Sequence, residues 1–117
     1  MLPTSANGPP TDERRTAARF ACKPQLFCRV IDPLDESMTT AGPWNLSRRG
    51  ACVIIEPHFA PGRHVEIAFH IPANGSSMYY QAEVVHTVLI PSLREMWLTG
   101  CSFCDGPVPE EELQPCL

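Results

Sequence analysis

Apolar and polar residues alternate along most of the chain after about residue 19, which is the pattern of half-buried β-strands. The clearest case is HVEIAFHIP, residues 64–72, in which every second residue from Val65 to Ile71 is apolar. Three further segments predict strands: GACVIIE at 50–56, MYYQAEVVHTVLI at 78–90 and EMWLTGCSFC at 95–104. A fifth segment, RFACKPQLFCRVI at 19–31, is interrupted near Pro24, which favours an edge or bulged strand.

Turn-forming residues separate these segments. The turn PHFAPGR has Pro61-Gly62 at its centre, and ANGSS carries the hairpin dipeptide Asn74-Gly75. Residues 32–44, DPLDESMTTAGPW, predict a polar loop, and the tail favours one helical turn between Pro109 and Pro115. Five or six short strands at regular spacing without a long helix predict an all-β fold, either a small antiparallel barrel or a sandwich.

The length of 117 residues predicts one domain. Residues 1–13 are rich in Pro, Gly, Ser and Asn, and we expect them to form a flexible N-terminal arm. The chain contains no apolar run of about 18 residues, so it predicts no membrane span. The N-terminus lacks the apolar centre of a signal peptide, and we therefore expect a cytoplasmic protein.

The six cysteines are expected to be free thiols that pack as small apolar residues. The pair Cys101-x-x-Cys104 has the spacing of a metal site, but residues three apart on a strand point to opposite faces. No second pair supplies further ligands, and His64 and His70 are expected to face solvent. The sequence therefore predicts no metal site.

Positive charge is concentrated although the net charge is −4. Eight of the nine basic residues are arginines, and five lie in two stretches, Arg14 to Arg19 and Arg48-Arg49. A general nucleic-acid binder would carry a broad basic surface, so the pattern instead favours one compact anion site. Arginine suits bidentate recognition of phosphate or guanine. Each stretch taken alone is also explained as a solvated turn whose Asn, Ser and Gly serve backbone geometry.

Taken together, the two stretches resemble the signature of the PilZ domain family. Arg15-x-x-x-Arg19 is followed 26 residues later by Asn45-x-Ser47-x-x-Gly50 and then an apolar strand. The resemblance continues to about residue 113 through three further segments: APGRHVEIAFHIP, YYQAEVVHTVL and WLTGCSFCDG. It implies a six-stranded antiparallel barrel over residues 14–113, followed by a tail at 114–117. It also implies a receptor for the bacterial second messenger cyclic di-GMP, with no catalytic activity and no cofactor.

The residues of the two motifs carry groups that such a ligand needs. Arg15 and Arg19 can each offer a bidentate fork to a phosphate or to guanine O6 and N7. Asn45 and Ser47 supply short polar groups, and Gly50 allows a close approach of the backbone. The family more often has Asp at the first position of the second motif, so Asn45 keeps an acceptor but loses the charge.

Several neighbouring residues are candidate extra contacts. In relatives, an arginine directly before the first motif often accompanies two stacked ligand molecules, which makes Arg14 a candidate. Arg48 and Arg49 either raise the local potential or face water. Trp44 could stack on a guanine, although a Trp before a strand more often anchors the core or a barrel end.

A mechanism and two alternatives follow from this interpretation. Ligand binding would order the N-terminal arm and so create or hide a surface for an effector protein. The first alternative is a PilZ-like protein-interaction adaptor without ligand. The second is a small barrel that binds single-stranded nucleic acid through Tyr79, Tyr80 or Phe103, which the negative net charge disfavours. No nucleophile–base pair suggests an enzyme.

Overall fold

The computed structural model describes residues 19–23, 26–72, 74–91 and 95–117. Within these residues it contains seven strands, one α-helical turn and one 3-10 turn. The strands are β1 (Phe20–Ala21), β2 (Phe27–Ile31), β3 (Met38–Ser47), β4 (Gly50–Ile55), β5 (His64–Ile71), β6 (Ser76–Ile90) and β7 (Met96–Phe103). The turns are α2 (Glu110–Leu113) and η2 (Gln114–Cys116).

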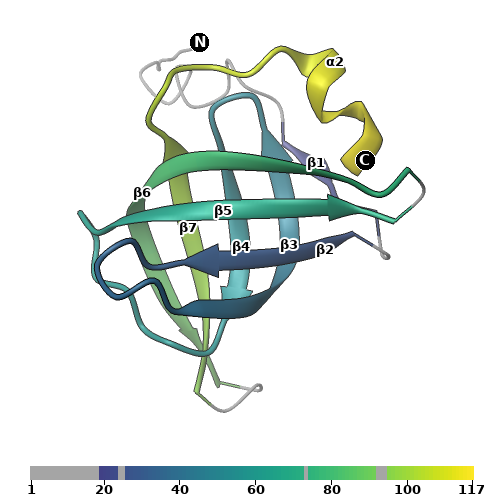
Figure 1. Ribbon diagram of the computed structural model, residues 1–117. Coiled ribbons are helices and arrows are strands. Elements are labelled where there is room, and N and C mark those ends of the chain that lie inside the picture. Colours follow the sequence, from purple (N-terminus) through teal and green to yellow (C-terminus); the bar gives the residue numbers. More distant parts are fainter. Residues whose placement is uncertain (1–18, 24–25, 73, 92–94) are drawn as a thin grey trace, which may run out of the picture.

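The strands form a closed antiparallel barrel. Their hydrogen-bonded order is β1-β3-β2-β5-β6-β7-β4, and an additional pairing of β3 with β4 closes the ring. Six strands, β2 to β7, make the barrel, while the two-residue β1 adds to β3 outside that ring. Figure 1 shows α2 beside one end of this barrel. The predicted all-β, six-stranded antiparallel barrel is therefore confirmed.

The prediction of a polar loop over residues 32–44 is wrong for its second half. β3 begins at Met38, pairs with β2 over Met38–Ala41, and pairs with β4 from Gly42 onward. Small and polar residues have low strand propensity, but hydrogen bonds to two neighbouring strands outweigh that preference. The register of β3 against β4 shifts between Pro43 and Asn45, so Trp44 is the extra residue of a β-bulge.

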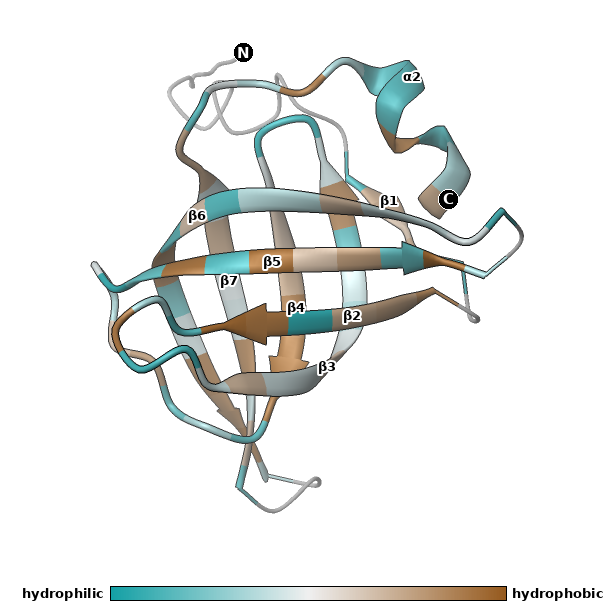
Figure 2. Ribbon diagram, viewed as in Figure 1, coloured by the Kyte–Doolittle hydropathy of each residue, from teal (hydrophilic) through white to brown (hydrophobic). Residues whose placement is uncertain are grey.

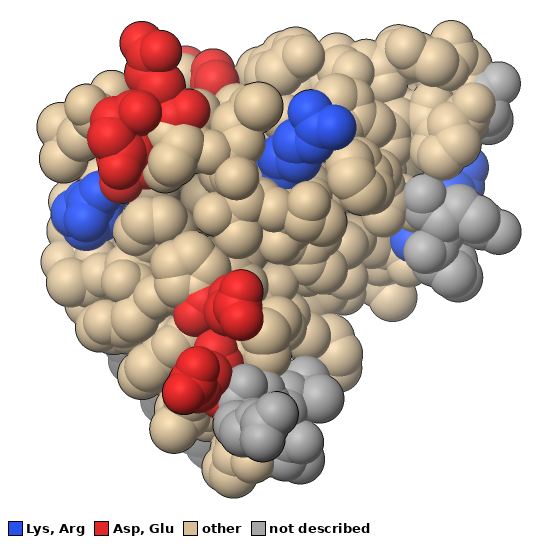
Figure 3. Space-filling model, turned by 60° about the horizontal axis from the view of Figure 1, so that its bottom comes forward, with Lys and Arg blue, Asp and Glu red and all other residues tan. Residues whose placement is uncertain are grey.

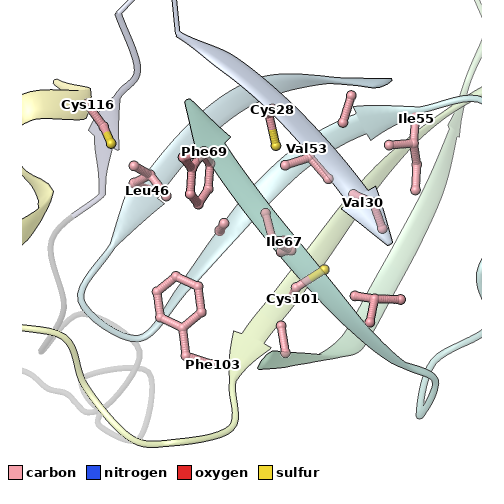
Figure 4. Close-up of a cluster of buried hydrophobic side chains, with 14 of the residues drawn as sticks. Cys28, Val30, Leu46, Val53, Ile55, Ile67, Phe69, Cys101, Phe103 and Cys116 are labelled. Carbon is pink, nitrogen blue, oxygen red and sulfur yellow. The ribbon is translucent and has the colours of Figure 1, made fainter. Parts of the chain in front are cut away.

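The core fills the inside of the barrel with side chains from all six barrel strands. The alternation along β5 places Val65, Ile67 and Phe69 inside, and Figure 2 shows apolar and polar residues alternating along this strand. The fully buried side chains include Phe69, Leu46, Ile55 and Ile67. Figure 4 shows these side chains converging from different strands.

The C-terminal turn packs on the barrel. Leu113 and Cys116 are completely buried in the same core cluster as the barrel residues. The Tyr80 hydroxyl donates a hydrogen bond to Glu112 Oε2 over 2.5 Å, and the Tyr80 ring packs on Phe103 with centroids 4.8 Å apart. The helical turn was predicted, but the chain continues through Pro115 as a 3-10 turn rather than stopping there.

The cysteines lie as free thiols, as the sequence predicts. Cys101 is buried on β7 while Cys104, beyond the strand end, is exposed, so the two thiols diverge. Among the described residues no three metal-ligating side chains come together. A helix with the length and apolar character needed to cross a membrane is also missing from this part of the chain.

Candidate ligand-binding site

Arg19, the last residue of the first motif, lies beside the second motif. β1 pairs with β3 so that Phe20 lies opposite Leu46 and Ala21 opposite Asn45. This pairing brings the preceding residue, Arg19, to the second motif. Arg19 Nη1 donates a hydrogen bond to Asn45 Oδ1 over 3.3 Å. The described arginine of the first motif and the first residue of the second therefore form one surface.

Ser47 shapes the turn between β3 and β4. Its Oγ accepts hydrogen bonds from the backbone N–H groups of Arg49 and Gly50, each over 3.2 Å. A serine that bonds the backbone two and three residues on stabilises a tight turn. The hydroxyl is thus already engaged in the free protein, and this turn sets the direction of the residues at 48 and 49.

Gly50 is required by the packing of the barrel itself. A Cβ at this position would collide with the backbone carbonyl of Cys101 on the neighbouring strand β7. The register pairs Gly50 with Ser102 and Ala51 with Cys101, so β4 and β7 approach closely here. This close approach is between two strands, and the approach of a ligand expected at Gly50 stays a prediction.

A pocket of about 170 Å³ lies beside this turn. It is lined by Arg19, Ser47, Arg49, Gly50, Ala51, Val85, His86, Gly100, Cys101 and Ser102. These residues come from the chain before β1, from the β3–β4 turn and from β4, β6 and β7. Of the described residues, none that lines the pocket carries a carboxylate. The arrangement is suited to binding an anionic group.

The two adjacent arginines have different positions. Arg48 Nε donates a hydrogen bond to the carbonyl of Val108 over 3.0 Å, and the Val108 N–H donates to the carbonyl of Arg48 over 2.7 Å. Arg48 therefore holds the C-terminal segment on the barrel. Arg49 lines the pocket, and its side chain has no hydrogen bond or ion pair to the described residues.

Trp44 does not anchor the core. As the extra residue of the β3 bulge, it is 56% exposed and immediately precedes Asn45. The expectation of a core anchor is wrong because the bulge removes Trp44 from the regular inside–outside alternation. It does not line the pocket described above.

The sequence patterns did not identify His86 and Val85 as pocket residues. The register of β6 against β7 shifts between Val84 and His86, so Val85 is the extra residue and His86 faces Gly100. The adjacent valines in AEVVH interrupt the alternation, and that interruption was the available signal for a bulge. Arg14 and Arg15 lie outside the described residues.

Comparisons with known proteins agree with this architecture. The PilZ domain of YcgR from Escherichia coli, in a structure titled as holding c-di-GMP, matches with a TM-score of 0.66 and 17% identity, over 87% of each chain. The MrkH–c-di-GMP complex of K. pneumonia matches with a TM-score of 0.64 and 13% identity, over 88% of this chain and 49% of that chain. No curated protein matches the chain.

Because their sequence identities are low, the structural matches establish only the fold. A match at the level of sequence establishes the family. The profile of the PilZ domain matches residues 13–115, which is most of the chain and includes both arginine-bearing stretches. The resemblance found in the two motifs is thus confirmed, and the chain belongs to the PilZ domain family.

Proposed function

We propose that this protein is a receptor for cyclic di-GMP. The observation that carries the proposal is the meeting of Arg19, Asn45 and the Ser47 turn beside a pocket without a described carboxylate. Both solved relatives named above are titled as complexes with c-di-GMP. The ligand is dianionic and carries two guanines, so it needs positive charge and groups that hydrogen-bond a base edge.

The described residues meet these needs in different ways. The guanidinium groups of Arg19 and Arg49 can each hold a phosphate or guanine O6 and N7 with two N–H donors. Asn45 has an amide N–H₂ that remains available while its Oδ1 accepts from Arg19. A pocket of about 170 Å³ is smaller than a typical small-molecule site, so it would accept one part of the dinucleotide. The rest of the ligand would lie against the surface.

Arg14 and Arg15 complete the proposed site. They precede Arg19 by five and four residues, so the chain leading into β1 would bring them to the same ligand. Each charge-assisted hydrogen bond contributes roughly 1.5–3 kcal/mol. In this proposal the N-terminal arm orders on binding, and its new position changes a surface that an effector protein recognises. Hydrogen exchange of residues 1–18 with and without ligand tests that step, and unchanged exchange on binding would exclude it.

Nucleic-acid binding has less support. On the face shown in Figure 3 the basic side chains lie apart from one another, with groups of acidic side chains among them. A phosphate backbone needs a continuous basic track. Of the aromatic candidates, Phe103 is only 7% exposed and Tyr80 packs on it.

The deciding experiment is a calorimetric titration of the purified protein with cyclic di-GMP. GTP and a short single-stranded oligonucleotide serve as control ligands, and an Arg15→Ala, Arg19→Ala double variant serves as the control protein. Saturable binding that only the cyclic dinucleotide produces, and that the double variant loses, supports the receptor. Its stoichiometry tests whether Arg14 marks a site for two ligand molecules. A folded protein that binds no cyclic di-GMP would instead be an adaptor without this ligand.

A further inference from the structure

His86 occupies an unusual position on the barrel wall. The β6 bulge at Val85 places His86 directly opposite Gly100 of β7. A Cβ on Gly100 would collide with the imidazole, because Cε1 and both ring nitrogens stand where that side chain would be. The ring therefore lies over the glycine, as aromatic rings do over glycines in other sheets.

The pocket around His86 contains cationic and polar side chains beside apolar ones. His86 is exposed and lines the pocket together with Arg19, Ser47 and Ser102, which places its ring among the proposed ligand contacts. The imidazole is one of the few side chains that can add both a donor and a positive charge near neutral pH. Nothing in the proposed receptor function, as stated above, makes use of it.

The elements around His86 carry the following charged or titratable groups. Arg19 comes from the chain before β1 and Arg49 from the β3–β4 turn. On β6, Glu83 has its carboxylate oxygen 4.0 Å from His64 Nε2 on β5. On β7, burial raises the pKa of the Cys101 thiol to about 12, so this thiol stays neutral at physiological pH. The immediate lining is therefore cationic or neutral.

We propose that His86 is a further ligand contact and that it makes binding of the anionic ligand dependent on protonation. This inference rests on the proposed receptor function. A dianionic ligand in the pocket favours the imidazolium over the neutral ring, because the opposite charges attract. Binding then takes up protons, and affinity rises as the pH falls through the range in which histidine titrates.

The change in affinity with pH depends on how strongly the ligand favours the protonated ring. If the ligand raises the pKa of a histidine by one unit, affinity increases by at most about tenfold between pH 8 and pH 5.5. The phosphodiester groups of the ligand stay ionised over this range, so they add no change. Arginine side chains in general keep their charge over this range. A pH dependence in this range would then come from a histidine or from the α-amino group, and the histidine variants show whether His86 is the source.

The test is calorimetric titration of the full chain with cyclic di-GMP at pH 5.5, 6.5, 7.2 and 8.0. At pH 6.5 it is repeated in buffers of different ionisation enthalpy, which gives the number of protons taken up. His86→Gln keeps a hydrogen-bonding side chain but cannot become charged. His64→Gln is the matched control, because His64 is an exposed histidine that faces Glu83 and does not line the pocket.

The expected result is an affinity that rises toward low pH with net proton uptake, both lost in His86→Gln and both kept in His64→Gln. As a second test, Gly100→Ala pushes the ring away without removing it, and a folded Gly100→Ala should lose the proton uptake. Wild-type binding without pH dependence, or a pH dependence that survives in His86→Gln, overturns this inference and leaves the receptor intact. Wild-type protein that does not bind at any pH overturns the receptor itself.

Discussion

Arg19 and Asn45 are 26 residues apart in the chain, and one hydrogen bond of 3.3 Å joins the guanidinium of the first to the amide oxygen of the second. The bond is exposed, so it adds little to stability. The bond instead fixes the position of the Arg19 guanidinium. The amide oxygen limits where the guanidinium can point, which prepares Arg19 for an anion in the adjacent pocket.

A double-mutant cycle tests this coupling. We expect Arg19→Ala to weaken cyclic di-GMP binding by about ten- to a hundredfold, through loss of a charge-assisted contact of roughly 1.5–3 kcal/mol. Asn45→Ala should weaken binding less, and the loss in the double variant should be smaller than the sum of the two single losses, because Asn45 acts partly through Arg19. Dissociation constants from calorimetry give the three differences. Strictly additive losses would show that the two residues act independently.

Replacing Arg49 should affect ligand binding, whereas replacing its neighbour Arg48 should affect stability. Arg49→Ala should weaken ligand binding about tenfold and leave the melting temperature unchanged, because Arg49 lines the pocket without a described partner. Arg48→Ala should lower the free energy of unfolding by about 1 kcal/mol, because the Val108 carbonyl loses a hydrogen-bond donor. Its affinity should stay near that of the wild type. Thermal unfolding and calorimetry on both variants form a matched pair, and an exchange of the two phenotypes would contradict the assignment.

Most of the fold follows from alternation along the sequence. The bounds of β4, β5 and β7 agree with the predicted segments within one residue at each end. Alternation gives the wrong prediction at Met38–Trp44, which resembles a loop because it contains small residues and Pro43. Two strand partners decide its structure, and a sequence pattern does not reveal partners.

The site was predictable only in part. Arg19 and Asn45 could be linked through the family resemblance, and the structure brings them together. His86 could not be linked to them, because its place depends on a single extra residue in β6 and on the register against Gly100. The roles of Arg48 and Arg49 were equally open, since only the position of the C-terminal segment separates them.

Gly50 should be essential for the fold and not only for binding. Gly50→Ala places a Cβ against the Cys101 carbonyl, so β4 and β7 must separate. We expect a loss of roughly 1–3 kcal/mol in the free energy of unfolding, the range for overpacked sites. Gly42→Ala is the control, because its Cβ would meet Ile54 Cβ at an ordinary 3.8 Å. Urea unfolding of both variants measures the difference, and equal stability of the two would refute the packing argument.

The contact between Tyr80 and Glu112 should hold the C-terminal turn on the barrel. Tyr80→Phe keeps the ring packing on Phe103 but removes the hydroxyl that donates to Glu112. The hydrogen bond is exposed, so we expect a loss of about 1 kcal/mol, at the low end for bonds to a carboxylate. Tyr79→Phe is the matched control, because Tyr79 is 57% exposed and should show no loss. Chemical unfolding of the two variants measures the loss in the free energy of unfolding. Equal losses would exclude a stabilising role for the contact between Tyr80 and Glu112.

The buried thiols should make the protein sensitive to alkaline pH. Burial is the main cause that raises the pKa of Cys22 to about 11 and of Cys101 to about 12, and it also raises the pKa of Cys28. These thiols stay protonated in the folded chain at pH values where the unfolded thiols, with an ordinary pKa of about 8.5, have ionised. The unfolded state is then favoured, so stability is retained below about pH 8.5 and falls above it.

At pH 10 the buried thiols of Cys28 and Cys101 should each lower the free energy of unfolding by up to about 2 kcal/mol relative to pH 7.5, and the half-buried thiol of Cys22 should contribute less. Urea unfolding in the presence of a reductant at both pH values measures the decline. Cys28→Ala should be less stable than the wild type at pH 7.5, because it leaves a small cavity, yet its decline toward pH 10 should be smaller. Cys104→Ala removes an exposed thiol and should keep nearly the full decline. If Cys28→Ala declined as steeply as the wild type, ionisation of the buried thiols would not be the cause.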